Sequence, residues 1–161
     1  MLATAGPLPT SDDFAFEPKW DGFRAIVFRG DDVFIQSRDL RPFDRYFPDL
    51  HAVFAAQLPK GCVIDGEIVI VKPEGLDFDA LQMRLHPAAS RVAKLAKETP
   101  AQFVAFDLLA LDGRDVREAA QRERRLLLER ALSALPPPIH VTPTTRDPLV
   151  AAEWLSRFEG A

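Results

Sequence analysis

A lysine stands in an unusual place near the start of the chain, inside the run FEPKWDGFRAIVF that covers residues 16–28. Lys19 has aromatic residues on both sides and is followed two residues later by an Asp-Gly pair. A lysine is a nucleophile when its amine is neutral, and apolar neighbours, nearby cations or a bound metal ion favour that form. Lys19 is therefore either a solvated surface charge or a reagent.

Carboxylates interrupt two segments that otherwise predict buried strands. Asp65 and Glu67 lie in the apolar run VIDGEIVI, and Asp107 lies beside Phe106 in FVAFDLLAL. Because side chains alternate along a strand, Asp65 and Glu67 share one face. Buried carboxylates are costly unless they are paired or hydrogen-bonded. Each of them alone fits a salt bridge as well as a functional group, but the set favours a shared polar cleft.

The same alternation places Glu17, Lys19 and Asp21 on one face, if the first strand extends back to them. Arg24 and Arg38 add guanidinium groups, which bind phosphate through a bidentate fork. A lysine, arginines, paired carboxylates and an aromatic ring that can stack on a base together fit attack on the α-phosphate of a nucleotide. The product would be a phosphoramidate on Lys19.

The wider pattern predicts an α+β fold with mainly antiparallel sheets and flanking helices. Alternating residues and the turn RGDD predict a hairpin within residues 14–38, and β-branched residues predict strands. The expected strands cover residues 62–71 and 102–111. The expected helices cover residues 48–58, 78–85 with Asp77 as cap, 87–98, 117–135, and a last one that starts at Asp147-Pro148.

The chain has 161 residues, 47% hydrophobic and 27% charged, which is typical of one soluble domain. Its single cysteine, Cys62, fits a reducing compartment, no apolar run reaches the length of a membrane span, and no signal peptide is recognisable. We therefore expect a cytoplasmic protein that does not bind membranes. A net charge of −4 argues mildly against nucleic acid. The acid-free cationic stretch at residues 81–97, which includes Arg84, is more typical of a solvated helix face.

The run EPKWDGFR resembles the Glu-x-Lys-x-Asp-Gly-x-Arg motif of covalent nucleotidyltransferases, namely ATP-dependent DNA ligases, RNA ligases and mRNA capping enzymes. It is followed in order by SRDLRPFDRYFPDL, VIDGEIVI and FVAFDLLALDG, which resemble the next motifs of ATP-dependent DNA ligases. The similarity runs along the whole chain and is nearest to the small bacterial ligases of the LigC type. It implies an ATP-grasp-like nucleotidyltransferase fold.

The resemblance also implies roles for the matching residues. Lys19 would be the catalytic nucleophile that carries AMP. Glu17 would contact the adenine edge, and Phe106 would stack on the adenine. Arg24 would bind ribose or the 5′-phosphate of nicked DNA, and Arg38 would contact a phosphate of the nucleotide or of the nick.

Metal binding is implied for the carboxylates of the motifs. Glu67 would hold ribose hydroxyls or a divalent cation, Mg²⁺ or Mn²⁺, and Asp65 and Asp21 are further candidates for the metal. One departure concerns the turn after Arg38. Many family members have a glycine soon after Ser-Arg, where this chain has Asp39 and Leu40.

The family reaction has three steps. The lysine attacks ATP and releases pyrophosphate, AMP passes to the 5′-phosphate of a nick in double-stranded DNA, and the 3′-hydroxyl displaces AMP to seal the strand in repair or recombination. Compared with that family, residues 1–161 are expected to form a partial adenylation domain with a loose lead-in at 1–13. The last motifs of the domain and the OB-fold domain are expected to be absent from residues 1–161, which predicts exposed strand edges and self-association.

Two alternatives stay open. The chain could bind a nucleotide or DNA without turnover, or it could belong with the RNA ligases and capping enzymes.

Overall fold

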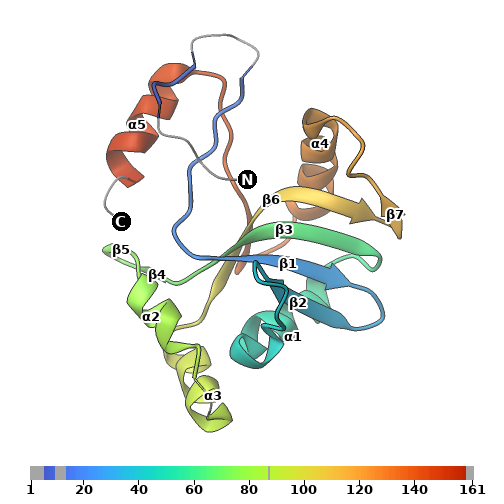
Figure 1. The fold of residues 1–161 in the computed structure, drawn as a ribbon, viewed down its shortest axis with the longest axis vertical. Helices are drawn as coiled ribbons and strands as arrows, with labels where there is room; N and C mark the ends of the chain where they lie inside the picture. Colours follow the sequence, from blue (N-terminus) through green and yellow to red (C-terminus); the bar gives the residue numbers. More distant parts are fainter. Residues whose placement is uncertain (1–5, 10–13, 87, 159–161) are drawn as a thin grey trace. The chain divides into compact units, whose positions relative to one another are not determined.

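The computed structural model describes residues 6–9, 14–86 and 88–158 (Figure 1). The chain divides into two compact units. The smaller unit combines residues 1–19 with 142–161, and the larger unit comprises residues 20–141.

A mainly antiparallel sheet forms the centre of the larger unit. In sheet order its strands are β2 (Val33–Ser37), β1 (Phe23–Arg29), β3 (Cys62–Val69), β6 (Gln102–Leu111) and β7 (Arg114–Asp115), with β8 (Ile139–Val141) paired in parallel to β6. A separate ribbon consists of β4 (Val71–Lys72) and β5 (Gly75–Leu76). This arrangement confirms the expected α+β class with mainly antiparallel pairing.

The helices of the larger unit are the 3₁₀ helix η1 (Asp44–Tyr46), α1 (Pro48–Gln57), α2 (Phe78–Met83), α3 (Ala89–Glu98) and α4 (Gln121–Leu132). Helices α1 and α4 pack against the sheet and bury its apolar face, while α3 packs on α1 and η1. Leu50 and Phe54 of α1 enter the same buried cluster as Leu128 and Leu132 of α4. Phe54 meets Phe103 of β6 edge-on, with ring centroids 5.1 Å apart.

Strand periodicity gives the sheet two different faces. Ala25 and Val27 of β1 are fully buried and lie opposite Gly66 and Ile64 of β3. Gly66 has to be a glycine, because a Cβ there would lie 2.4 Å from the ring of Phe103. The residues between these positions face the other side of the sheet, where Arg24, Asp65 and Glu67 are found.

Arg84 is fully buried and joins several segments of the larger unit. Its guanidinium donates to both carboxylate oxygens of Asp49 and to the backbone carbonyls of Tyr46 and Thr99. It also lies 5.0 Å from the ring centroid of Phe47. The prediction that Arg84 belongs to a solvated cationic face is therefore wrong, since its charge is neutralised inside the protein.

Replacement of Arg84 by methionine should destabilise the fold by about 3–5 kcal/mol, because it leaves the Asp49 carboxylate without its ion-pair partner. Urea unfolding followed by circular dichroism measures the difference. The matched control is Arg91→Met on the exposed side of α3, which should change stability by no more than about 0.5 kcal/mol. Equal effects of the two substitutions would contradict a central role for Arg84.

The smaller unit contains a short backbone pairing and one helix. Phe16 and Thr145 exchange two backbone hydrogen bonds of 2.8 and 3.0 Å. Helix α5 (Pro148–Phe158) follows Asp147, whose carboxylate accepts a 2.8 Å hydrogen bond from the N–H of Leu149. The helix start expected at Asp147-Pro148 is thus confirmed.

Other expected elements are confirmed with shifted bounds. The hairpin is formed by β1 and β2, and Asp77 caps α2 by accepting a hydrogen bond from the N–H of Ala80 at 2.8 Å. The helix expected at 117–135 is shorter, and the start at Pro87 expected for α3 lies outside the described residues.

Within the described part of the chain, no helix is long and apolar enough to cross a membrane. Self-association through strand edges stays a prediction.

The expectation of a strand through residues 14–22 is wrong. β1 begins at Phe23, and before it Phe16 makes an isolated bridge. Pro18 cannot donate to a strand ladder, which helps to explain why the strand does not extend back. Strand alternation therefore cannot align Glu17, Lys19 and Asp21 on one face.

Candidate functional site

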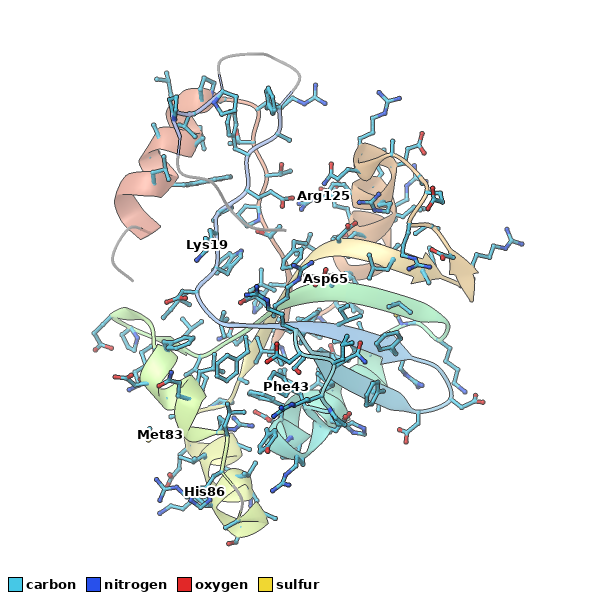
Figure 2. All side chains as sticks on the ribbon, in the orientation of Figure 1. Lys19, Phe43, Asp65, Met83, His86 and Arg125 are labelled. Carbon is cyan, nitrogen blue, oxygen red and sulfur yellow. The ribbon has the colours of Figure 1, made fainter. Side chains whose placement is uncertain are left out.

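An arginine–carboxylate pair lies at the centre of the polar face of the sheet. The Nε and Nη2 atoms of Arg24 on β1 donate to the two carboxylate oxygens of Asp65 on β3, at 3.0 and 2.6 Å. Asp65 is only 4% exposed, and Figure 2 labels it within the sheet. The hydrogen bond from Asp65 raises the pKa of Arg24 above its ordinary value, so the guanidinium is fixed in place and charged at every physiological pH.

The same guanidinium lies over an aromatic ring. The central carbon of Arg24 is 5.6 Å from the ring centroid of Phe106 on β6. Phe106 is half-buried, so part of its ring remains open. Three of the predicted site residues, Arg24, Asp65 and Phe106, are thus brought together.

A β-bulge explains the position of Phe106. On β6, Asp107 lies opposite Asp65 and Ala105 lies opposite Gly66, which leaves Phe106 as the extra, unpaired residue. Bulges re-aim a side chain and are common beside active sites. The sequence does not reveal this irregularity, because FVAFDLLAL is compatible with a regular strand.

Glu67 lies directly opposite Arg24 across the β1–β3 pairing. The Asp-Gly pair before β1 supports this arrangement, since a Cβ on Gly22 would lie 2.3 Å from the carbonyl oxygen of Ile68 and 2.9 Å from Cγ of Glu67. Any other residue at position 22 would displace β3 or Glu67. The glycine of the motif is therefore required for close approach of the two strands.

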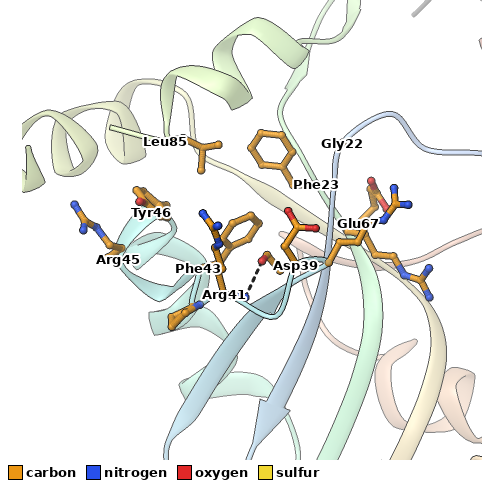
Figure 3. Close-up of a pocket in the computed structure, with 13 residues that line it drawn as sticks. Gly22, Phe23, Asp39, Arg41, Phe43, Arg45, Tyr46, Glu67 and Leu85 are labelled. Atoms are coloured by element: carbon orange, nitrogen blue, oxygen red, sulfur yellow. Dashed lines mark hydrogen bonds between the residues drawn. The ribbon is translucent and has the colours of Figure 1, made fainter. Parts of the chain in front are cut away.

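Glu67 and Arg24 also line a cavity of about 680 Å³ (Figure 3). Its walls come from the start of β1, the turn after β2, η1 and the segment after α2. The charged lining residues are Arg24, Arg38, Asp39, Arg41, Arg45 and Glu67. Arg38, expected at a phosphate, is thus in the same cavity as Arg24 and Glu67.

A tight turn presents Arg38 and Asp39 to this cavity. Ser37 and Arg41 are joined by a 2.8 Å backbone hydrogen bond, and the Ser37 hydroxyl accepts a second bond from the Arg41 N–H at 3.0 Å. This leaves a three-residue loop whose last position, Leu40, has a φ of 60°. Such loops favour glycine there, because left-handed backbone is strained for other residues. Leu40 is 72% exposed, so no core packing offsets the strain.

The substitution Leu40→Gly should stabilise the chain by about 1 kcal/mol, because glycine adopts the left-handed backbone without a steric penalty. Thermal and urea unfolding measure the gain. Leu40→Ala is the matched control, since it removes the same exposed side chain but keeps the Cβ. If the alanine variant gains as much as the glycine variant, backbone strain is not the cause.

Asp107 lies opposite Asp65 on the neighbouring strand, but it is paired with a different arginine. Both of its carboxylate oxygens accept hydrogen bonds from Arg124 of α4, at 2.9 and 2.8 Å. Arg124 also donates to the carbonyl of Ala119 at 2.7 Å. Asp107 therefore fastens α4 to β6. Of the three strand carboxylates, only Glu67 lines the cavity, and Asp65 is linked to it through Arg24.

The remaining predicted residues precede β1. Lys19 and Glu17 belong to the smaller unit, and both are exposed; Figure 2 labels Lys19 on the segment ahead of the first strand. Asp21 is exposed at the beginning of the larger unit.

The carboxylates offer few ligands for a metal ion. Among the described residues, no group of three or more His, Cys, Asp or Glu side chains could hold a cation. Both oxygens of Asp65 are bound by Arg24. Glu67, which lines the cavity opposite Arg24, is therefore the better candidate for a metal ligand. Mg²⁺ is commonly bound by one or two carboxylates together with substrate phosphates, and this is the mode that the donor set fits.

Sequence reasoning missed several cavity residues. Arg41 and Arg45 follow Arg38 in the run SRDLRPFDR, but the sequence does not show which of its arginines are paired. Phe43 and Tyr46 form a half-buried aromatic wall, with ring centroids 6.2 Å apart in an edge-on arrangement.

The chain matches the family model of the ATP dependent DNA ligase domain over residues 7–160. It is 55% identical over 148 residues to DNA ligase C2 of Mycolicibacterium smegmatis and 54% identical over 154 residues to DNA ligase C of Mycobacterium tuberculosis. These matches cover 91% and 92% of this chain but 42% and 43% of the relatives. The chain therefore spans less than half the length of these curated relatives.

Solved structures give the same result. The ligase domain from M. tuberculosis LigD is similar with a TM-score of 0.68 and 31% identity, over 91% of this chain and 45% of that chain. A mycobacterial DNA ligase D complexed with ATP and MES is similar with a TM-score of 0.60 and 31% identity, over 81% and 40%. The chain belongs to the ATP-dependent DNA ligase domain family. The resemblance to small LigC-type ligases and the expected nucleotidyltransferase fold are confirmed.

Proposed function

We propose that the chain supplies the adenylation step of an ATP-dependent DNA ligase that seals nicks in double-stranded DNA during repair. The observation that carries the proposal is the fixed Arg24–Asp65 pair over Phe106, with Glu67 in the adjacent register position. It offers a held cation for phosphate or ribose, an aromatic face for a base and a carboxylate for hydroxyls or a metal.

In the proposed step, Nζ of Lys19 attacks the α-phosphorus of ATP. A phosphorus–nitrogen bond forms, the bond from the α-phosphorus to the oxygen bridging to the β-phosphate breaks, and pyrophosphate leaves with that oxygen. The amine loses a proton to solvent. Covalent geometry alone keeps the Cα atoms of Lys19 and Gly22 within about 11 Å, so the nucleophile stays close to the start of β1.

The other residues bind and orient the substrate. Arg24 contacts ribose or a phosphate and is held in place by Asp65, which we assign to this positioning role rather than to a metal. Phe106 stacks on the adenine, and Glu17 contacts the adenine edge. A divalent cation, Mg²⁺ or Mn²⁺, would neutralise phosphate charge, with Glu67 as its protein ligand.

Arg38 contacts a phosphate of the nucleotide or the nick, and Asp21 is assigned to ordering Lys19 or a metal-bound water. The proposed reaction consumes ATP, and we assign it to the cytoplasm. A chain that binds nucleotide or DNA without turnover is the second candidate, because the relatives are more than twice as long.

Incubation of the chain with ATP and Mg²⁺ should increase its intact mass by one AMP, because Lys19 becomes covalently adenylated. The increase should be absent in Lys19→Ala. GTP in parallel tests the capping-type alternative. Nucleotide binding without a mass increase would support the second candidate and contradict adenylation by this chain.

The substitution Phe106→Ala should weaken ATP binding by about 1–3 kcal/mol, the range for loss of a base–aromatic stack. Isothermal titration calorimetry measures the change. The matched control is Phe34→Ala on β2, a partly exposed phenylalanine outside the site, which should leave ATP affinity unaltered. If Phe106→Ala unfolds the chain or binds ATP normally, the ring serves packing instead.

A further inference from the structure

The turn after β2 and the 3₁₀ helix η1 contribute three arginines to the lining of the cavity. Arg38, Arg41 and Arg45 are all exposed, and all three line it. Within the described part of the chain, neither Arg38 nor Arg41 has a hydrogen bond or ion pair from its guanidinium. Unpaired arginines beside a concave surface are well suited to phosphate, because the planar guanidinium binds two oxygens at once.

Arg45 is held differently from the other two. Its guanidinium lies 4.9 Å from the ring centroid of Tyr46, so it is oriented by stacking. Tyr46 and Phe43 continue the wall, and Phe23 approaches Phe43 with ring centroids 5.9 Å apart. The cavity therefore combines a cationic edge with an aromatic wall.

The arrangement fits a nucleic-acid backbone better than a nucleoside triphosphate. The three arginines are spread over residues 38–45 and all are exposed, whereas a triphosphate concentrates its charge at one place. A nucleic-acid strand presents its charges in a row, about one per 3.4 Å of rise. Aromatic walls beside such a row can stack a base or a sugar.

We propose that Arg41 and Arg45 bind the sugar-phosphate backbone of the nicked DNA and extend the phosphate contact implied for Arg38. This proposal rests on the proposed function, since it names the surface that receives the DNA substrate. Arg41 and Arg45 lie in the run SRDLRPFDRYFPDL, in which the resemblance implies a role for Arg38 alone. Their assignment comes from their exposure and from their place in the lining of the cavity.

The test is the salt dependence of DNA binding. Fluorescence anisotropy of a labelled nicked duplex is measured with the chain over a series of KCl concentrations, for the wild type and for Arg41→Gln/Arg45→Gln. The double variant should bind at least 10-fold more weakly, and the slope of log K against log salt should fall by about 1.8, about 0.9 for each lost phosphate contact. Arg41→Lys/Arg45→Lys, which keeps the charges, should restore most of the slope.

The matched control is Arg114→Gln/Arg122→Gln, which removes the same charge from exposed positions on β7 and α4 and should leave the slope unchanged. An unchanged slope in the Arg41/Arg45 variant, an equal loss in the control, or no binding of the duplex by the wild-type chain would overturn the proposal. The intact-mass assay with ATP is run on every variant. Loss of adenylation with normal DNA binding would instead assign the cavity to the triphosphate and also overturn it.

Discussion

The polar face of the sheet depends on compensation of one buried charge. Asp65 is almost entirely removed from solvent, and a buried carboxylate without a partner costs several kcal/mol. Arg24 supplies the partner through two hydrogen bonds, so its guanidinium cannot move away without leaving that charge uncompensated. The pair thereby fixes a cation above Phe106. Asp65, from one motif, orients Arg24, from another.

The two faces of the sheet are coupled through glycine. Gly66, between Asp65 and Glu67, makes room for Phe103 in the core, while Gly22 makes room for the β3 backbone at the entrance of β1. Each glycine thus permits a close contact between neighbouring segments of the sheet. That contact in turn sets the position of the carboxylates on the polar face. The bulge at Phe106 adds the third adjustment. The same backbone positions in β1, β3 and β6 therefore determine both the packing of the core and the geometry of the site.

Periodicity and residue type were sufficient to predict the sheet class, most helices, and the grouping of Arg24, Asp65 and Glu67. They failed where partners are distant in sequence. The pairing of Arg84 with Asp49 and of Arg124 with Asp107 depends on how helices dock, which no local pattern encodes. The strand assigned to residues 14–22 failed for a local reason, because alternation was extended through Pro18. The bulge at Phe106 could not be predicted from the sequence, since it changes the strand register and leaves the residue pattern unaltered.

Net charge was a poor guide to the surface, because it does not show which charged residues are paired within the fold. The chain is acidic overall, yet its cavity is lined by four arginines and two carboxylates. What distinguishes these arginines is their pairing. Arg84 and Arg124 are neutralised by carboxylates within the fold, and Arg24 is held by Asp65 while its side chain stays partly exposed. Among the described residues, the guanidinium groups of the exposed Arg38 and Arg41 have no hydrogen-bond or ion-pair partner. A guanidinium that is both buried and satisfied by a carboxylate, as in Arg84, cannot reach a phosphate, whereas Arg24 is paired but keeps an exposed edge. Pairing and exposure together therefore separate structural from ligand-binding arginines better than their number or spacing does.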